Sequence, residues 1–410
     1  MAEDLAGRLR DSLRRQEDRL GASLILNPVE NVPFADDLAV VASPLHGLYN
    51  SDKARARAQR LETEIQFSGR QAIEEDSRMI YAAWANALGA ADATLRVLSG
   101  LNAHVTLFMA MAEPGQRVFL LPVAAGGHLS GKAILERLGL EVVDLPIDNE
   151  SMAVDMPAAL ERVVDDPPDF LFIDRSEGLV FEDFSPLAEV EGPVTIFDSS
   201  QYLTNVICGD HPNPFAWGFD LMIASVHKNF PGPQKALLAT READETWRRI
   251  LSGVSTYVSN MHSVSTYAAA LTLTRREWLG NYSRRMLRVA VTLEDELDRC
   301  GVPVVKRPRD RPPTHHVWIK ETDRERAFTT YEWLEQCLIL TNFRTLPYGL
   351  GPGLRLGVNA AVRLGLVESD IPRLSELIAE IRSTGPIPSL RKEANSFSRE
   401  IWSRQGERWT

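Results

Sequence analysis

One lysine stands where its amine can do chemistry. Lys228 follows an apolar run at 221–224 that has the length and branching of a buried strand, and a turn rich in proline and glycine comes at 231–233. Lys228 is therefore predicted to lie at the edge of a sheet, beside His227. Partial burial lowers the pKa of an amine, and a neutral amine can attack a carbonyl carbon to form a Schiff base.

A carboxylate lies thirty positions upstream of that lysine. Asp198 ends the run 194–198, which again has the pattern of a buried strand. In pyridoxal phosphate sites an aspartate keeps the pyridine nitrogen protonated, so that the ring accepts electrons, and a lysine carries the cofactor. A single lysine after a strand is more often an ordinary surface residue. The two strand-end residues together predict a site for pyridoxal 5'-phosphate.

Alternating strands and helices must position these two side chains. Strands are predicted at 118–121, 141–145, 170–174, 194–198, 221–225 and 236–240, and helices at 54–88, 102–112, 130–138 and 157–164. This alternation predicts an α/β fold with a mostly parallel sheet that helices cover on both faces.

A second, smaller region follows a helix-rich segment at 262–298. Its strands are predicted at 304–307, 316–320 and 354–359, and its helices at 323–337 and 368–383, which is an α+β pattern. The sequence therefore predicts a helical arm at 1–22, a large α/β domain at 23–280 and a small C-terminal domain at 281–410.

Composition and charge exclude several classes of function. The chain has 410 residues, of which 44% are hydrophobic and 25% charged, as in a globular chain of more than one domain. A formal charge of -11 disfavours nucleic acid or an anionic membrane as a partner, and no apolar run approaches the roughly 18 residues of a membrane span. Three widely spaced cysteines fit neither a disulfide framework nor a metal site, and residues 2–20 lack a signal-peptide core. The pattern predicts a reduced, cytoplasmic protein.

Short motifs follow one another in a defined order. They are Glu30-Asn31, Ser99-Gly100-Leu101-Asn102-Ala103 at a helix start, Gly126-Gly127-His128-Leu129 after a strand, Asp198, His227-Lys228 with Gly232-Pro233, and Leu354-Arg355-Leu356-Gly357. Each motif is weak alone, but the ordered set resembles serine hydroxymethyltransferase over roughly residues 22–365. The resemblance implies a fold-type-I pyridoxal-phosphate enzyme with a seven-stranded type of sheet in its large domain.

The cofactor would be held by residues at several strand ends. Ser99 and Gly100 open a helix, whose backbone donors and positive end can hold a phosphate, although a plain serine N-cap is the simpler interpretation. The resemblance implies that His128 stacks on the cofactor ring and that Ser176 lies near its phenolic oxygen; loop and turn residues are the alternatives. We further assign three residues to the cofactor pocket: Gln201, Ser225 and His227.

The amino-acid substrate would be bound on the other side of the cofactor. Arg355 has the planar fork that matches a carboxylate, and its leucine neighbours favour partial burial over an ordinary surface position. The resemblance implies that Glu30 lies near the substrate as a proton carrier, beside Val29. It also implies that Tyr49 is lent across a homodimer interface, so that two chains share their active sites. His316 has a family counterpart too, or is purely structural.

Departures from the family pattern cluster on the folate side. Val29 replaces the serine that precedes Glu-Asn in the family, and Gln201 replaces a histidine. The segment 49–52 reads Tyr-Asn-Ser-Asp, so the glutamate tied to folate chemistry is absent at Ser51, and the following Tyr-Tyr-Gly-Gly is replaced at about 54–57. Leu346-Pro347-Tyr348-Gly349 stands where the family has the Pro-Asn pair that contacts the pterin.

These features together predict the reaction class. We expect folate-independent aldol chemistry at Cα of glycine, serine or threonine, in which a glycyl unit passes between aldehydes to give a β-hydroxy amino acid, as in threonine transaldolases. The alternatives are a folate-dependent hydroxymethyltransferase, an aminotransferase or decarboxylase on the same scaffold, and a non-catalytic protein that binds pyridoxal phosphate. Retention of Asp198, Lys228 and Arg355 argues against the last of these.

Overall fold

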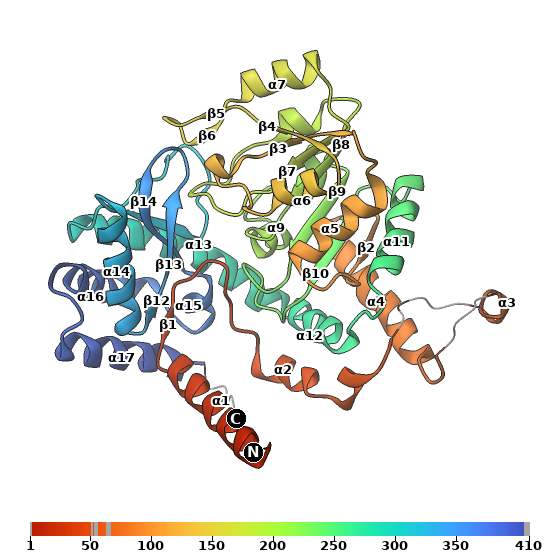
Figure 1. The fold of residues 1–410 in the computed structure, drawn as a ribbon. Helices are drawn as coiled ribbons and strands as arrows, with labels where there is room; N and C mark the ends of the chain where they lie inside the picture. Colours follow the sequence, from red (N-terminus) through yellow and green to blue (C-terminus); the bar gives the residue numbers. More distant parts are fainter. Residues whose placement is uncertain (1, 51, 53–55, 63–66, 406–410) are drawn as a thin grey trace.

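A seven-stranded sheet forms the centre of the larger part of the molecule (Figure 1). The computed structural model describes residues 2–50, 52, 56–62 and 67–405, and within them the strand order is β2-β10-β9-β8-β7-β3-β4. In this sheet β10 is antiparallel to both neighbours and the other pairs are parallel, which confirms the predicted α/β class. The strands are β2 (Asp92–Thr94), β3 (Arg117–Leu120), β4 (Glu141–Asp144), β7 (Phe170–Ile173), β8 (Val194–Asp198), β9 (Leu221–Ser225) and β10 (Ala236–Thr240).

Apolar side chains project from both faces of this sheet, and helices cover both faces. Ile223 on β9 packs with Trp247 on one face, whereas its neighbour Met222 packs with Trp84 on the other. Successive side chains of a strand point to opposite faces, which explains why these strands read as continuous apolar runs. The covering helices include α4 (Gln71–Leu88), α5 (Gly100–Met111), α6 (Gly131–Arg137), α7 (Met156–Asp165), α9 (Leu203–Cys208), α11 (Glu245–Tyr257) and α12 (Ser263–Thr274).

The predicted site residues lie on segments that follow the carboxyl ends of strands. Neighbouring parallel strands point the same way, so these segments start along one edge of the sheet, where ligands bind in α/β folds. The segments after β2, β3, β7, β8 and β9 carry, respectively, Ser99, His128, Ser176, Ser200 and Lys228, and Asp198 is the last residue of β8.

A smaller antiparallel sheet lies in the C-terminal part. Its order is β11 (His316–Lys320), β14 (Gly351–Gly357), β13 (Asn342–Leu346). Its core also includes Leu24 and Ile25, because β1 (Leu24–Ile25) pairs in parallel with β12 (Ile339–Leu340). The long helix α13 (Arg276–Arg299) spans the predicted boundary at residue 280, and the domain limits stay a prediction. Helices α14 (Arg324–Gln336), α15 (Asn359–Arg363), α16 (Ile371–Thr384) and α17 (Pro388–Ser403) complete this part.

Some predicted elements differ from the structure. The helix expected over 54–88 is divided into α3 (Arg57–Leu61) and α4, and Gly69 before α4 adopts a left-handed φ of 72°. The strand expected at 304–307 is reduced to a single bridge between Val304 and Ile319, because prolines at 303 and 308 remove backbone donors on either side. Short β2, β13 and the terminal α17 were not predicted.

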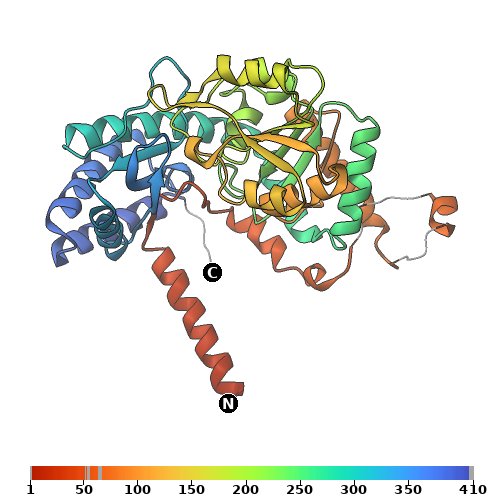
Figure 2. The same ribbon diagram turned by 45° about the horizontal axis from the view of Figure 1, so that its top comes forward.

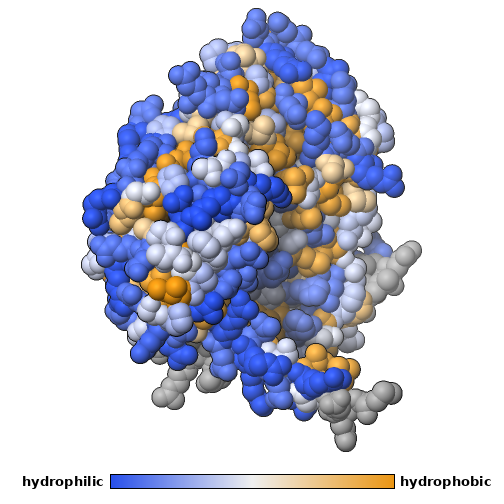
Figure 3. Space-filling model, turned by 60° about the vertical axis from the view of Figure 1, so that its left-hand side comes forward, coloured by the Kyte–Doolittle hydropathy of each residue, from blue (hydrophilic) through white to orange (hydrophobic). Residues whose placement is uncertain are grey.

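Helix α1 (Ala2–Leu20) projects from the body of the molecule (Figure 2). Three of its leucines, Leu5, Leu9 and Leu13, are more than half exposed. On the face drawn in Figure 3 polar side chains predominate, and apolar ones gather beside a hollow. Within the described residues, every helix is too short or too polar to cross a membrane.

Candidate active site

Two distant segments hold the main chain of Lys228. Its carbonyl oxygen accepts hydrogen bonds from Asn31 Nδ2 at 2.6 Å and from Asn359 Nδ2 at 3.1 Å. The amide of Asn359 also donates to the carbonyl oxygen of Glu30 at 2.6 Å. The N-terminal segment, the lysine loop after β9 and the C-terminal part therefore meet at this residue. Lys228 itself is partly buried, as its position after a strand predicted.

Asp198 at the end of β8 is buried, and each of its two oxygens has a hydrogen-bond partner. Its Oδ1 accepts from the backbone N–H of Ser200 at 2.7 Å, and its Oδ2 lies 2.6 Å from His104 Nε2. Burial alone would raise the pKa of Asp198, but the hydrogen bond and positive charge of His104, with the charge of Lys228, lower it to about 2. The carboxylate is therefore ionised at neutral pH, as a partner of a protonated pyridine nitrogen must be.

A small cradle forms at the N-terminus of α5. Ser99 caps the helix, since its Oγ accepts from the backbone N–H of Asn102 at 3.2 Å. A Cβ on Gly100 would lie 2.5 Å from Ser225 Oγ, so the close approach of α5 to this serine requires glycine. Ser225 also donates its N–H to Ser200 Oγ at 2.8 Å. Hydroxyl groups and the positive end of α5 thus gather at one place, which is the chemistry that a phosphate group needs.

His128 lies on the loop after β3, beside His104. Burial, then the positive charges of His104 and Lys228, lower the pKa of His128 to about 4, so its ring is neutral. Its Nδ1 accepts from the backbone N–H of Ser130 at 3.2 Å, which places the proton on Nε2. The ring meets that of His104 edge-on, with 5.8 Å between centroids. A neutral, flat ring held in this way suits stacking on a cofactor.

Arg355 on β14 points back to the large domain. Its Nη1 lies 3.4 Å from the carbonyl oxygen of Ser176 and 3.6 Å from Glu177 Oε2, and its Nε has no hydrogen-bond partner among the described residues. Glu177 is fully buried and its other oxygen lies 2.6 Å from Arg344 Nε. Burial raises the pKa of Glu177 while the two arginines oppose the rise. Glu177 thus offsets one of two positive charges, which leaves one for a substrate carboxylate.

Gln201 joins the large domain to the small sheet. Its Oε1 lies 3.3 Å from His316 Nε2, and within the described residues its buried Nε2 has no partner. Burial holds the pKa of His316 well below its usual value, so this ring is neutral too. The Nδ1 atom of His227, the last of the assigned cofactor residues, lies 3.1 Å from the backbone carbonyl oxygen of Lys235 and donates to it.

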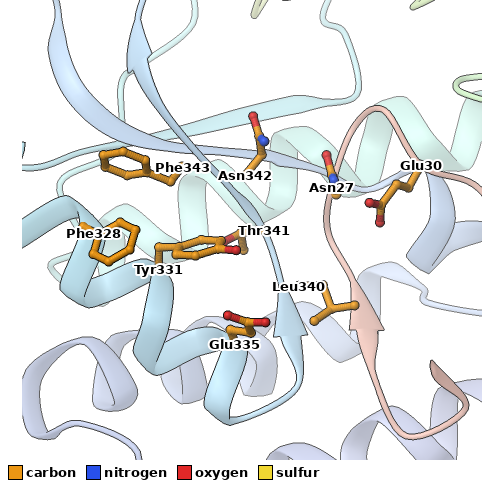
Figure 4. Close-up of a pocket in the computed structure, with 9 residues that line it drawn as sticks. All are labelled: Asn27, Glu30, Phe328, Tyr331, Glu335, Leu340, Thr341, Asn342 and Phe343. Carbon is orange, nitrogen blue, oxygen red and sulfur yellow. The ribbon is translucent and has the colours of Figure 1, made fainter. Parts of the chain in front are cut away.

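Glu30 lies at a pocket of about 440 Å³ (Figure 4). The carboxylate faces the ring of Tyr331 across this pocket. Glu30 is exposed at the pocket wall, and partial desolvation by the surrounding atoms raises its pKa against the effect of an Asn27 hydrogen bond. A carboxyl group with a raised pKa exchanges protons closer to neutral pH. The pocket is lined by Asn27, Glu30, Phe328, Tyr331, Glu335, Leu340, Thr341, Asn342 and Phe343.

A larger pocket of about 720 Å³ adjoins Arg355. Its lining includes Arg344 and a run at 345–349, and Asn342 and Phe343 border both pockets. Tyr348 closes one side: its hydroxyl donates to the carbonyl oxygen of Ala125 at 3.1 Å. The space therefore lies between the loop after β3 and the small sheet.

Comparison with known proteins identifies the family. A family model of serine hydroxymethyltransferase matches residues 4–378. The chain belongs to the serine hydroxymethyltransferase family. Serine hydroxymethyltransferase of Pyrobaculum islandicum is 29% identical over 369 residues, 87% of this chain and 86% of that protein. The enzyme of Sulfolobus acidocaldarius is 27% identical over 323 residues, 75% and 74% of the two chains.

A solved structure shares the fold of this serine hydroxymethyltransferase family member. L-threonine transaldolase from Pseudomonas fluorescens, crystallised in its internal aldimine state, matches with a TM-score of 0.90 and 21% identity over 98% of this chain and 92% of that chain. The family confirms the predicted fold class, and this chain is a pyridoxal-phosphate-dependent transferase.

The residues at the sheet edge fit the cofactor of the family. The N-terminus of α5 at Ser99 and Gly100 suits its phosphate, ionised Asp198 suits its ring nitrogen, and Lys228 would supply the amine. When bound, pyridoxal phosphate supplies an electron sink for bonds at Cα of an amino acid. The roles of the individual residues remain proposals.

Within a single chain, no contact that the structure describes joins the predicted substrate residues Tyr49 and Val29 to the residues around Asp198. Tyr49 is 39% exposed and packs against Phe67, with 4.4 Å between ring centroids. Val29 is partly buried beside Glu30. Ser51 and residues 53–55, on which part of the folate interpretation rests, lie outside the described residues. A shared site across a dimer stays a prediction.

Sequence reasoning missed two buried groups beside Asp198. His104 lies four residues after Gly100, so both face the same side of α5, and this spacing was the available signal. Asp174 follows β7, and the sequence around it indicates only the end of a strand. Glu177 was missed as well, because nothing in a turn sequence indicates that a carboxylate will be buried between two arginines.

Proposed function

We propose that this family member catalyses folate-independent aldol chemistry, in which a glycyl unit passes from a β-hydroxy amino acid such as L-threonine to another aldehyde. The observation that carries the proposal is Tyr348. It stands where the family has a pterin-contacting amide, and both its hydroxyl and its backbone N–H are used on the carbonyl oxygens of Ala125 and Ala124, at 3.1 and 2.7 Å. A hydroxyl and an N–H that donate in this way are not available as donors to a polar pterin ring.

The amino-acid half of the site supports the same proposal. Arg355 binds the substrate carboxylate with its fork, while Glu177, which is paired with Arg344, lies beside the Arg355 guanidinium. Lys228 carries the cofactor. The bond between Cα and Cβ of threonine breaks, the proton of the β-hydroxyl passes to Glu30, and acetaldehyde leaves. Addition to the new aldehyde reverses these events, and Glu30 returns the proton to the new oxygen.

The pocket of about 720 Å³ would hold the acceptor aldehyde. Phe343, Leu346 and Pro347 give it apolar walls, and Arg324 and Arg344 give it polar ones. Such a lining suits an aromatic or sugar-like aldehyde better than formaldehyde, which needs far less space. The Pseudomonas fluorescens transaldolase has the same fold, and its named activity is a model for this proposal only.

A homodimer with shared active sites belongs to the proposal. Tyr49 and the exposed leucines of α1 are apolar surfaces that a second chain would cover. We also propose that the protein works in the cytoplasm.

The second candidate is a folate-dependent serine hydroxymethyltransferase, which the names of the relatives favour. Purified holoenzyme should be incubated with L-threonine and an aromatic aldehyde, without folate, and acetaldehyde and the new β-hydroxy amino acid should be measured by mass spectrometry. The proposal predicts both products. If instead serine cleavage rises many-fold with tetrahydrofolate while threonine is inert, the second candidate is correct. Formation of an oxo acid or an amine would indicate an aminotransferase or decarboxylase, and no turnover would indicate a binding protein.

A further inference from the structure

A buried histidine contacts the carboxylate that the cofactor needs. His104 on α5 is 3% exposed, and its Nε2 lies 2.6 Å from Asp198 Oδ2. On its other side, His104 Nδ1 lies 3.7 Å from Asp174 Oδ2. The ring also packs edge-on against Phe172, with 5.2 Å between centroids, so it has little room to turn. Nothing in the motif comparison assigns a role to His104 or Asp174.

The charges of this cluster are mutually consistent. Burial alone would lower the pKa of His104, but the two carboxylates outweigh burial and raise it. Asp174 has a pKa raised to about 7, because burial outweighs the attraction of His104. Asp198, by contrast, is held ionised by the donated hydrogen bond. A cationic ring thus separates two buried carboxylates and pairs most closely with the one at the cofactor.

Metal binding explains these distances less well than hydrogen bonding. The ligand atoms of His104, Asp174 and Asp198 lie within 4.8 Å of one another, close enough to suggest an ion. Two ligands at ~2.0 Å from a tetrahedral zinc ion are about 3.3 Å apart. The 2.6 Å between His104 and Asp198 is shorter than that and is the length of a charge-assisted hydrogen bond.

We propose that His104 is a positioning residue that holds Asp198 in the one orientation that serves the pyridine nitrogen, and that Asp174 orients His104. Each oxygen of Asp198 then has one fixed donor, His104 for Oδ2 and the Ser200 N–H for Oδ1, so the carboxylate cannot turn freely. Without His104, two buried carboxylates would face each other, share a proton and turn. The inference rests on the family cofactor and not on the proposed acceptor or on folate independence.

The first test compares cofactor affinity. His104→Ala should weaken pyridoxal phosphate binding about 10- to 100-fold, the effect of losing a hydrogen bond to a charged group. His104→Asn keeps one N–H donor and should recover part of that loss. The matched control is His211→Asn, since His211 is equally buried in the same domain but bonds to the carbonyl oxygen of Pro313. It should lower thermal stability without changing the dissociation constant.

The second test is the pH dependence of that affinity. Asp174, Asp198, Lys228 and His128 all act on His104, and they are unchanged in the variants. Removing the histidine cation should let the carboxylate pair protonate at higher pH. The acidic fall in cofactor affinity should therefore begin at least one pH unit higher in both His104 variants than in the wild type. A purely structural histidine would leave this onset in place.

Nuclear magnetic resonance of the wild-type protein without cofactor gives a readout independent of those variants' folding. The ring of His104 should titrate above the ordinary histidine range, and Asp174→Asn should lower its pKa by removing one of the two carboxylates. The proposal is overturned if His104 titrates at or below the ordinary value. It is equally overturned if folded His104→Asn binds the cofactor with wild-type affinity and an unshifted acidic onset.

Discussion

Replacing Arg355 by alanine removes the proposed clamp on the amino-acid carboxylate. The side chain is only 4% exposed, and its Nε has no partner among the described residues, so a carboxylate can take up its fork without displacing a protein hydrogen bond at that atom. Each hydrogen bond to a charged group contributes about 1.5–3 kcal/mol. The contact to Glu177 is long, at 3.6 Å, so little is lost when Arg355 turns to the substrate.

We therefore expect Arg355→Ala to weaken binding of glycine or L-threonine by about 2–4 kcal/mol, or roughly 30- to 1,000-fold. Arg355→Lys should restore only part of this, because an ammonium lacks the second parallel donor. Amino-acid affinity can be followed by the change in cofactor absorbance on titration, and the absorbance before titration should match the wild type.

The matched control is Arg363→Lys. Arg363 is as buried as Arg355, but its guanidinium packs 3.8 Å from the ring centroid of Phe34 and it does not line the pocket beside Arg355. That variant should be less stable yet bind the amino acid normally. Wild-type affinity in Arg355→Ala would refute the clamp and direct attention to Arg344. A loss in Arg363→Lys as large as in Arg355→Ala would show that the effect is general to the fold.

The remaining predictions concern the cofactor, the pH response and the assembly. Lys228→Ala should abolish borohydride-sensitive visible absorbance while still retaining pyridoxal phosphate, as measured by equilibrium dialysis; a wild-type protein that stays colourless with the cofactor would contradict the site. Gly100→Ala should weaken cofactor binding at least tenfold, because its Cβ would lie 2.5 Å from Ser225 Oγ; unchanged affinity would mean that the cradle is elsewhere. Burial lowers the pKa of His211 to about 4, so its contribution to the free energy of unfolding should be full above pH 6.5 and fall by up to about 3 kcal/mol as the pH drops to 4. Denaturation curves measured at several pH values should show a weaker dependence of the free energy of unfolding on pH in His211→Asn. Light scattering should give a dimer, and a fully active monomer near 45.7 kDa would remove the proposed role of Tyr49.

Much of the fold could be predicted because burial leaves a direct trace in sequence. Strands β7, β8 and β9 are buried on both faces, so their apolar runs stand out and their ends fall within a residue of the prediction. Asp198 and Lys228 were found for the same reason, since each follows such a run. The edge strand β2 has only three residues, too short for periodicity to show, and Gly69, with its left-handed φ before α4, lies in a stretch that otherwise reads as helix.

The groups that surround Asp198 and Arg355 could not be predicted from the sequence, because their positions depend on which strand ends become neighbours. His104 reads as one more residue of a helix, and Asp174 as the end of a strand. They meet only because β7 and β8 are adjacent in the sheet and α5 packs across their carboxyl edge. The same holds for Glu177, whose role requires that β13 and β14 bring Arg344 and Arg355 to one loop. A buried carboxylate is costly unless it is paired, so each of these groups fixes where its partner must lie. The chemistry of the site is thus distributed in pairs across the two parts of the molecule, Asp198 with His104 in one and Glu177 with Arg355 between both.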